Sequence, residues 1–176
     1  MKLLRKSLRS FSRDRAGAAS VEFVMIAPLY FAFVFSMFEA GWLMTKSMML
    51  ERGLDMTVRE LRFGSAASLN TNEFKKVICS HSKIIRDCED SMTLNQVLVK
   101  SAGDIPDKAE CVDRTAPAKP AKKLIPGDED EFMYVSACVF VNPIFPFLGL
   151  GLHLPKDELG GMALIAYSAY VTEPSG

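Results

Sequence analysis

An uncharged, strongly apolar run between Glu22 and Glu39 most constrains what this chain can fold into. At a rise of about 1.5 Å per residue, the two carboxylates on one helix lie about 25 Å apart along its axis. A bilayer's hydrocarbon core is about 30 Å thick, so the run can cross it with both acids near the edges. Trp42 falls where an interfacial aromatic residue is expected. The sequence therefore predicts a membrane-spanning helix over residues 18–45.

The net charge of zero conceals a split between the two ends of the chain. Residues 1–16 carry six bases and one acid, a net charge of +5, whereas residues 17–176 carry 15 bases and 20 acids, a net charge of −5. A basic tail can bind nucleic acid, but a tail that adjoins a membrane-length run is better explained as a topology signal. We therefore expect a cytoplasmic N-terminus, a translocated body and no nucleic-acid partner.

All four cysteines (Cys79, Cys88, Cys111 and Cys138) follow the predicted span. An even number of cysteines in a translocated domain suggests two disulfides. Of the three possible pairings we favour Cys79 with Cys88 and Cys111 with Cys138; the alternative is four free buried thiols in a cytosolic domain. No C-x-x-C pair occurs, so we expect no metal site.

The small residues of this chain lie on the wrong side of the apolar run for an ordinary signal peptide. A secretory signal is cut at small residues after its apolar stretch, but here residues 38–41 make a poor site. Residues 16–19 (Ala-Gly-Ala-Ala) precede the run instead. Cutting there would remove the basic leader, residues 1–17, and keep the hydrophobic segment. A true signal peptide, with a mature N-terminus beyond Trp42, is the weaker alternative.

This arrangement resembles a prepilin peptidase site, in which a small residue precedes the cut and a glutamate stands at mature position five. The wider run resembles the TadE-like family of pseudopilins of the tight-adherence (Tad/Flp) pilus over residues 15–63. The motifs that carry the resemblance are Val21-Glu22-Phe23, Pro28 and Glu39-Ala40-Gly41.

The resemblance implies cleavage between Gly17 and Ala18 and assembly through Glu22, Phe23 and Pro28. It implies a minor pilin that supports pilus biogenesis and adherence, sits once in the bacterial inner membrane and places its C-terminal domain in the periplasm. The implied partners are the inner membrane, the prepilin peptidase and other Tad pseudopilins and pilus assembly proteins. The alternative is a bitopic membrane protein with an uncleaved leader and a periplasmic binding domain.

The physics of Glu22 supports a pairing role. A carboxylate in a spanning helix costs about 2.5–3.5 kcal/mol at mid-membrane and less near an edge, so a partner is expected. Cleavage would create one, the α-amino group of Ala18, four residues away on the same helix face or reached from a neighbour. The alternative is a snorkelling acid without a role, and we favour that interfacial interpretation for Glu39. Pro28 crowds the carbonyl of Val24, which predicts a kink or local melting.

Beyond the span the pattern predicts an α+β domain, residues 65–176, joined by an amphipathic extension of the helix over residues 46–64. Gly64 is the expected breaker. The extension carries an apolar stripe of helical period, which we expect to pack on a core. Its members are Leu43, Leu50, Leu54, Val58 and Leu61.

The remaining elements are a short helix over residues 73–85, capped by Thr71 or Asn72, and an antiparallel sheet. Strands are predicted for residues 92–99, 131–141 and 161–172, the last two paired with each other. The apolar segment 142–160 between them is rich in proline and glycine. It is either a covering flap or a contact patch that exposes Ile144, Phe145, Phe147 and Leu148.

No catalytic motif occurs: there is no nucleophile elbow, no H-E-x-x-H and no phosphate-binding glycine loop. The two histidines have no partner at ligand spacing. We therefore expect no enzyme activity, no cofactor and no small-molecule substrate.

Overall fold

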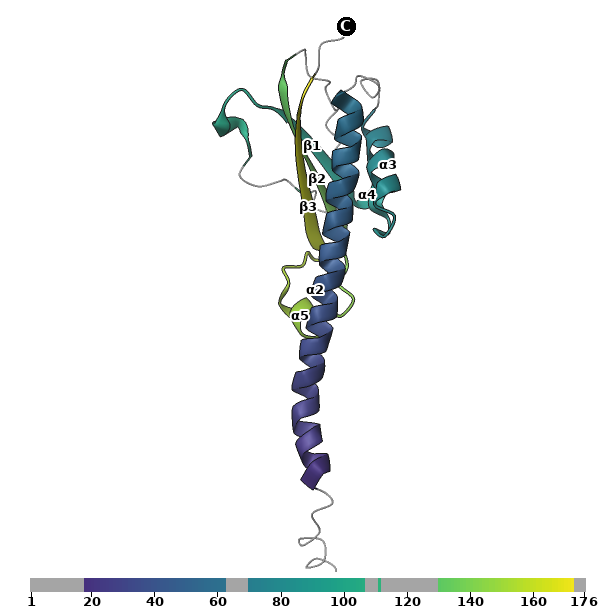
Figure 1. Ribbon diagram of the computed structural model, residues 1–176, viewed down its shortest axis with the longest axis vertical. Helices are drawn as coiled ribbons and strands as arrows, with labels where there is room; N and C mark the ends of the chain where they lie inside the picture. Colours follow the sequence, from purple (N-terminus) through teal and green to yellow (C-terminus); the bar gives the residue numbers. More distant parts are fainter. Residues whose placement is uncertain (1–17, 63–69, 107–110, 112–129, 173–176) are drawn as a thin grey trace, which may run out of the picture.

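The structure is a computed structural model that describes residues 18–62, 70–106, 111 and 130–172. Its spine is α2 (Ala18–Arg62), a helix of 45 residues and so about 67 Å long. One end of α2 packs on a small sheet and on α3 (Thr71–His81), and the other end projects away from them (Figure 1). This is the predicted α+β arrangement.

The sheet has three antiparallel strands in the order β1-β2-β3. They are β1 (Met92–Leu98), β2 (Phe132–Val141) and β3 (Met162–Val171). The three predicted strands are thus confirmed to within a residue or two at their ends, and β2 and β3 pair as expected, with Phe132 opposite Val171. A short 3-10 turn, η2 (Ala102–Asp104), follows β1.

The apolar stripe of α2 packs on the sheet and α3, as predicted. Leu50 and Leu54 are fully buried, Val58 and Leu43 nearly so, and Leu61 lies against the same core. Beside this stripe, Asp55 accepts a hydrogen bond from the Ser168 hydroxyl of β3 at 2.7 Å. The predicted breaker Gly64 lies outside the described residues.

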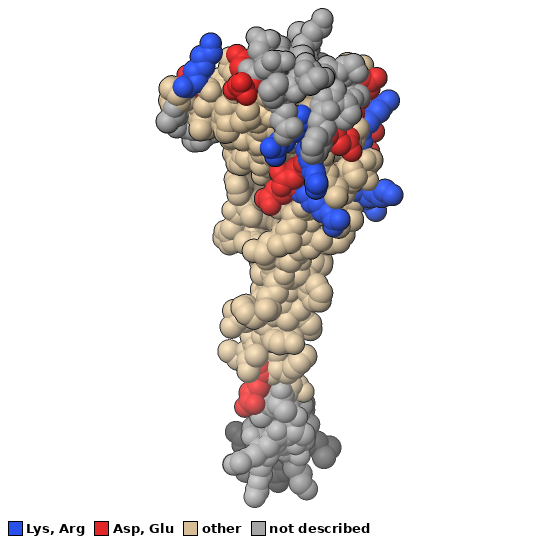
Figure 2. Space-filling model, turned by 45° about the horizontal axis from the view of Figure 1, so that its top comes forward, with Lys and Arg blue, Asp and Glu red and all other residues tan. Residues whose placement is uncertain are grey.

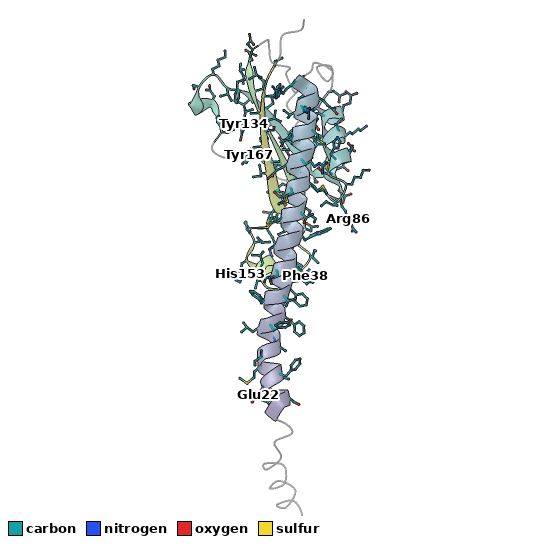
Figure 3. All side chains as sticks on the ribbon, viewed as in Figure 1. Glu22, Phe38, Arg86, Tyr134, His153 and Tyr167 are labelled. Carbon is teal, nitrogen blue, oxygen red and sulfur yellow. A yellow bond between two sulfur atoms is a disulfide. The ribbon has the colours of Figure 1, made fainter. Side chains whose placement is uncertain are left out.

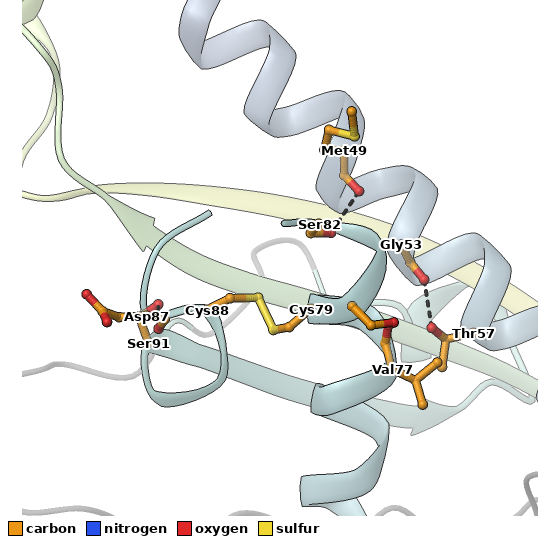
Figure 4. The surroundings of a disulfide bond; sticks show 10 residues. Met49, Gly53, Thr57, Val77, Cys79, Ser82, Asp87, Cys88 and Ser91 are labelled. Carbon is orange, nitrogen blue, oxygen red and sulfur yellow. Dashed lines mark hydrogen bonds between the residues drawn. A yellow bond between two sulfur atoms is a disulfide. The ribbon is translucent and has the colours of Figure 1, made fainter. Parts of the chain in front are cut away.

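Helix α3 crosses α2 closely at Gly53, where an added Cβ would meet the Ile78 carbonyl at 2.8 Å. The prediction for this helix was wrong at both ends. Its N-cap is Asn70, whose side chain accepts from Asn72 and Glu73 while Glu73 accepts from the Asn70 N–H, a capping box that Thr71 could not complete. It stops at His81 because Ser82 turns back and donates its hydroxyl to the Met49 carbonyl of α2 (Figure 4).

Two disulfides fasten the globular end. One joins Cys79 of α3 to Cys88 of α4 (Cys88–Ser91), as Figure 4 shows, and the other joins Cys111 to Cys138 of β2. These are the two pairings that the sequence favours. The described residues contain no free cysteine.

Helix α2 continues through Pro28 without interruption. The local melting considered at Val24 is therefore absent, and a kink at this position stays a prediction. Membrane helices tolerate an internal proline because neighbouring groups satisfy the freed carbonyl.

Candidate functional site on the projecting helix

The projecting half of α2 presents a continuous apolar surface. Phe23, Leu29 and Phe33 are each at least 65 % exposed, and most of the large apolar side chains around them are exposed as well. Figure 2 shows most charged side chains of this face gathered over the globular end, and below them a long uncharged stretch that ends at an acidic side chain near the far end of the helix. Of the described residues, Ser20–Arg62 alone form a helix long and apolar enough to cross a membrane. Such a surface needs lipid or other protein to cover it.

Glu22 lies exposed near the free end of this helix (Figure 3). Phe23 beside it is 65 % exposed and Pro28 is also exposed. The three predicted assembly residues thus share the projecting part of α2, and all three are exposed. Gly17 lies outside the described residues, and Ala18 is the first residue of α2.

Glu39 occupies an entirely different environment. It is completely buried, although it belongs to the same projecting helix. The backbone N–H of Ile144 donates to Glu39 Oε1 at 3.0 Å, and that of Phe145 donates to Oε2 at 2.8 Å. Both carboxylate oxygens therefore bind the segment between β2 and β3, which we name the flap, residues 142–160.

A second contact fastens the flap one turn lower. The backbone N–H of Leu150 donates to Ser36 Oγ at 3.0 Å, while the Ser36 hydroxyl donates to the Ala32 carbonyl at 2.7 Å. Gly149 has a φ of +54° and lies so close to α2 that an added Cβ would collide with Ser36 Oγ and would stand 2.8 Å from the Ala32 carbonyl. Only glycine suits both the conformation and the space.

The flap is also tied to itself. Lys156 Nζ donates to the Pro146 carbonyl at 2.9 Å and to the Gly151 carbonyl at 2.7 Å. A short helix, α5 (Leu150–His153), forms its turning point and lies against α2 in Figure 1. These bonds hold an irregular, proline-rich segment in one conformation.

Aromatic packing accompanies the hydrogen bonds. The rings of Phe35 and Phe145 lie 4.8 Å apart. Two turns above Glu39, Lys46 Nζ lies 5.3 Å from the centre of the Trp42 ring, a cation–π distance. Burial lowers the pKa of Lys46, the Glu39 carboxylate opposes that shift, and Arg86 adds to it. A nearby carboxylate stabilises the charged form of a lysine, so the effect of Glu39 is to raise the Lys46 pKa.

The sequence left two interpretations of this segment open, a covering flap and an exposed apolar patch, and the structure shows features of both. It covers α2 through Phe145, and it also exposes apolar side chains on its outer side. Phe147 is 84 % exposed. Ile144, Leu148 and Leu152 are about half exposed.

Sequence reasoning missed Glu39, which it treated as an interfacial acid. Its partners are backbone N–H groups more than 100 positions away in the sequence. The pattern of side chains does not indicate which backbone N–H groups will reach a given carboxylate. One signal was present: Ala32 and Ser36 are small residues four apart on the same helix, a spacing that lets another segment approach closely.

Residues 17–59 match the family described as TadE-like protein. Neither the comparison with curated proteins nor the comparison with solved structures found a match. The matched stretch runs from the small-residue site through the projecting half of α2 and into the part that packs on the sheet. The resemblance expected from the sequence is confirmed there: residues 17–59 are similar to the TadE-like family.

Proposed function

We propose that this protein is a minor pilin, or pseudopilin, of a Tad-type pilus assembly system. The observation that carries the proposal is the TadE-like match over residues 17–59, which coincides with an exposed apolar helix that begins at a small-residue site. Its role is structural: the chain is the substrate of a peptidase and is not itself an enzyme. It supports pilus biogenesis and adherence together with other Tad pseudopilins.

Processing comes first in this proposal. The chain inserts with its basic leader in the cytoplasm and its disulfide-bonded domain in the periplasm. A prepilin peptidase cuts between Gly17 and Ala18, and the projecting helix stays in the inner membrane as a single span. Cleavage converts an amide at Ala18 into a cationic α-amino group at neutral pH.

Assembly follows through the projecting helix. The new amine and Glu22 carry opposite charges, and both lose their hydration when apolar helix surfaces come together. Binding a subunit that provides the opposite charge is therefore favoured. Phe23 and the neighbouring apolar side chains would then be covered by other pseudopilin helices. The exposure of Glu22 in the single chain leaves its carboxylate accessible to such a partner.

A Glu22→Ala variant tests assembly separately from processing. We expect normal loss of residues 1–17 but a reduced amount of the chain in the pilus-associated fraction. Glu51→Ala is the matched control, because Glu51 is an exposed acid on the same helix beyond the span. Normal piliation in the Glu22 variant would overturn the pairing.

The alternative is a bitopic membrane protein that keeps its leader and uses its periplasmic domain for binding. Intact mass of the chain extracted from membranes separates the two. Loss of residues 1–17 supports the pseudopilin; a full-length chain in cells with an active peptidase overturns it and leaves the alternative.

A further inference from the structure

The outer side of the flap lies at a depth where lipid is expected. If Glu22 marks one edge of a hydrocarbon core of about 30 Å, the other edge falls about 20 residues later, close to Trp42. Glu39 and Ser36 precede Trp42 by three and six residues, so they lie about 4 Å and 9 Å inside that edge. The flap is hydrogen-bonded to both of them.

We propose that the flap inserts its turning point into the membrane leaflet next to the globular domain. The side chains that would contact lipid are Ile144, Phe147, Leu148 and Leu152, all of them at least 47 % exposed. The chain would thus enter the bilayer twice, through the spanning helix and through this shallow wedge. This goes beyond the proposed pilin role and holds whether or not the leader is cleaved.

The backbone of the flap has the hydrogen bonding that such a position demands. Irregular backbone is tolerated at membrane depth only where its polar groups find partners in the protein. Glu39 accepts from two backbone N–H groups of the flap and Ser36 accepts from a third, while Lys156 donates to two of the flap's carbonyls. Pro143 and Pro146 have no N–H to satisfy. A loop in water would not need this many internal partners.

The distribution of charge agrees with the depth. Along the flap, the charged residues Lys156, Asp157 and Glu158 come only after the turning point, where the chain returns to β3. In Figure 3, His153 lies level with Phe38, which is about 6 Å inside the edge and limits the wedge to the outer part of the leaflet. Trp42 follows at the level of the headgroups, where such residues anchor proteins.

The wedge also explains why Glu39 is covered. A carboxylate facing lipid is costly, and this one is fully buried and accepts hydrogen bonds from two N–H groups of the flap. The surface that α2 and the flap present together is therefore apolar through the region that carries Glu39.

Fluorescence quenching tests this placement. The full chain carries Trp42→Phe, which removes its one tryptophan, together with Phe147→Trp, and is reconstituted into vesicles of phosphatidylcholine and phosphatidylglycerol. Lipids brominated at different acyl positions report depth, and acrylamide reports water access. Phe132→Trp in the same background is the matched control, because Phe132 is 41 % exposed at the far end of the sheet.

We expect the new tryptophan at position 147 to lose most of its emission to lipids brominated near the headgroup end of the chains, and to resist acrylamide. The control should respond in the opposite way. Strong acrylamide quenching at position 147 would overturn the proposal. Shielding from both quenchers would also overturn it, since it indicates burial against protein. Leu148→Trp provides the same test if the first variant fails to form its disulfides.

Discussion

Replacing Glu39 with glutamine should loosen the flap without unfolding the domain. Glutamine keeps the size of the side chain but has one carbonyl oxygen, so it can accept from only one of the two flap N–H groups. Its NH2 group would face the other N–H, and two donors cannot bond. The variant loses a hydrogen bond to a charged group, about 1.5–3 kcal/mol, and leaves a buried donor unsatisfied.

That loss acts on the equilibrium between a closed and an open flap. Each 1.4 kcal/mol is a factor of ten, so the amides of Ile144 and Phe145 should exchange their hydrogens about 10 to 100 times faster in Glu39→Gln. The assay is hydrogen–deuterium exchange of the membrane-reconstituted chain, followed in the peptide that spans the start of the flap. Peptides of β2 should be unchanged, because β2 is hydrogen-bonded to β1 on one side and to β3 on the other.

Glu51→Gln is the control for a lost charge on the same helix. Glu51 is exposed, and its carboxylate accepts a long hydrogen bond from the Ser47 hydroxyl, at 3.5 Å. It should leave flap exchange as it is. Unchanged exchange at Ile144 and Phe145 in Glu39→Gln would refute the reasoning, and so would an equal acceleration across the whole sheet, since that would mean global destabilisation.

Two further substitutions probe the flap and the disulfides. Gly149→Ala should open the flap and accelerate hydrogen exchange at Leu150, because the new Cβ collides with Ser36. Gly160 also has a positive φ, +79°, but nothing lies within 4 Å of an added Cβ, so Gly160→Ala should not accelerate exchange at Leu150. Equal effects of the two variants would mean that backbone strain alone opens the flap. Removing the Cys111–Cys138 bond, with a separation of 27 residues, should lower the free energy of unfolding by about 3–4 kcal/mol. Removing Cys79–Cys88, with a separation of 9, should cost about 2.5 kcal/mol; chemical denaturation measures both, and a reversed order would contradict the loop-entropy argument.

Much of the fold could be read from the sequence because its signals are local. The helical period of Leu50, Leu54 and Val58 gives the buried face of α2, and all three are buried. The β-branched and aromatic runs give β2 and β3. The TadE-like resemblance rests on motifs within residues 17–59, which lie close together in the chain.

What the sequence did not give depends on contacts between distant segments. From the sequence, Glu39 is expected at the membrane boundary, because the two flap N–H groups that bind it are distant in the chain. Gly53 looks like a weak helix residue until α3 crosses there. The cap of α3 was predicted one or two residues too late, at Thr71 or Asn72, because neighbouring polar residues can all cap a helix and only the reciprocal bond with Glu73 selects Asn70.

The central claim is that the basic leader is removed and the apolar helix is retained. N-terminal sequencing of the protein from its native host, with and without the prepilin peptidase, tests this most directly. The account predicts a chain that begins at Ala18 when the peptidase is present and at Met1 when it is absent. A chain that begins at Met1 in both strains, or at any residue beyond Trp42, would contradict it.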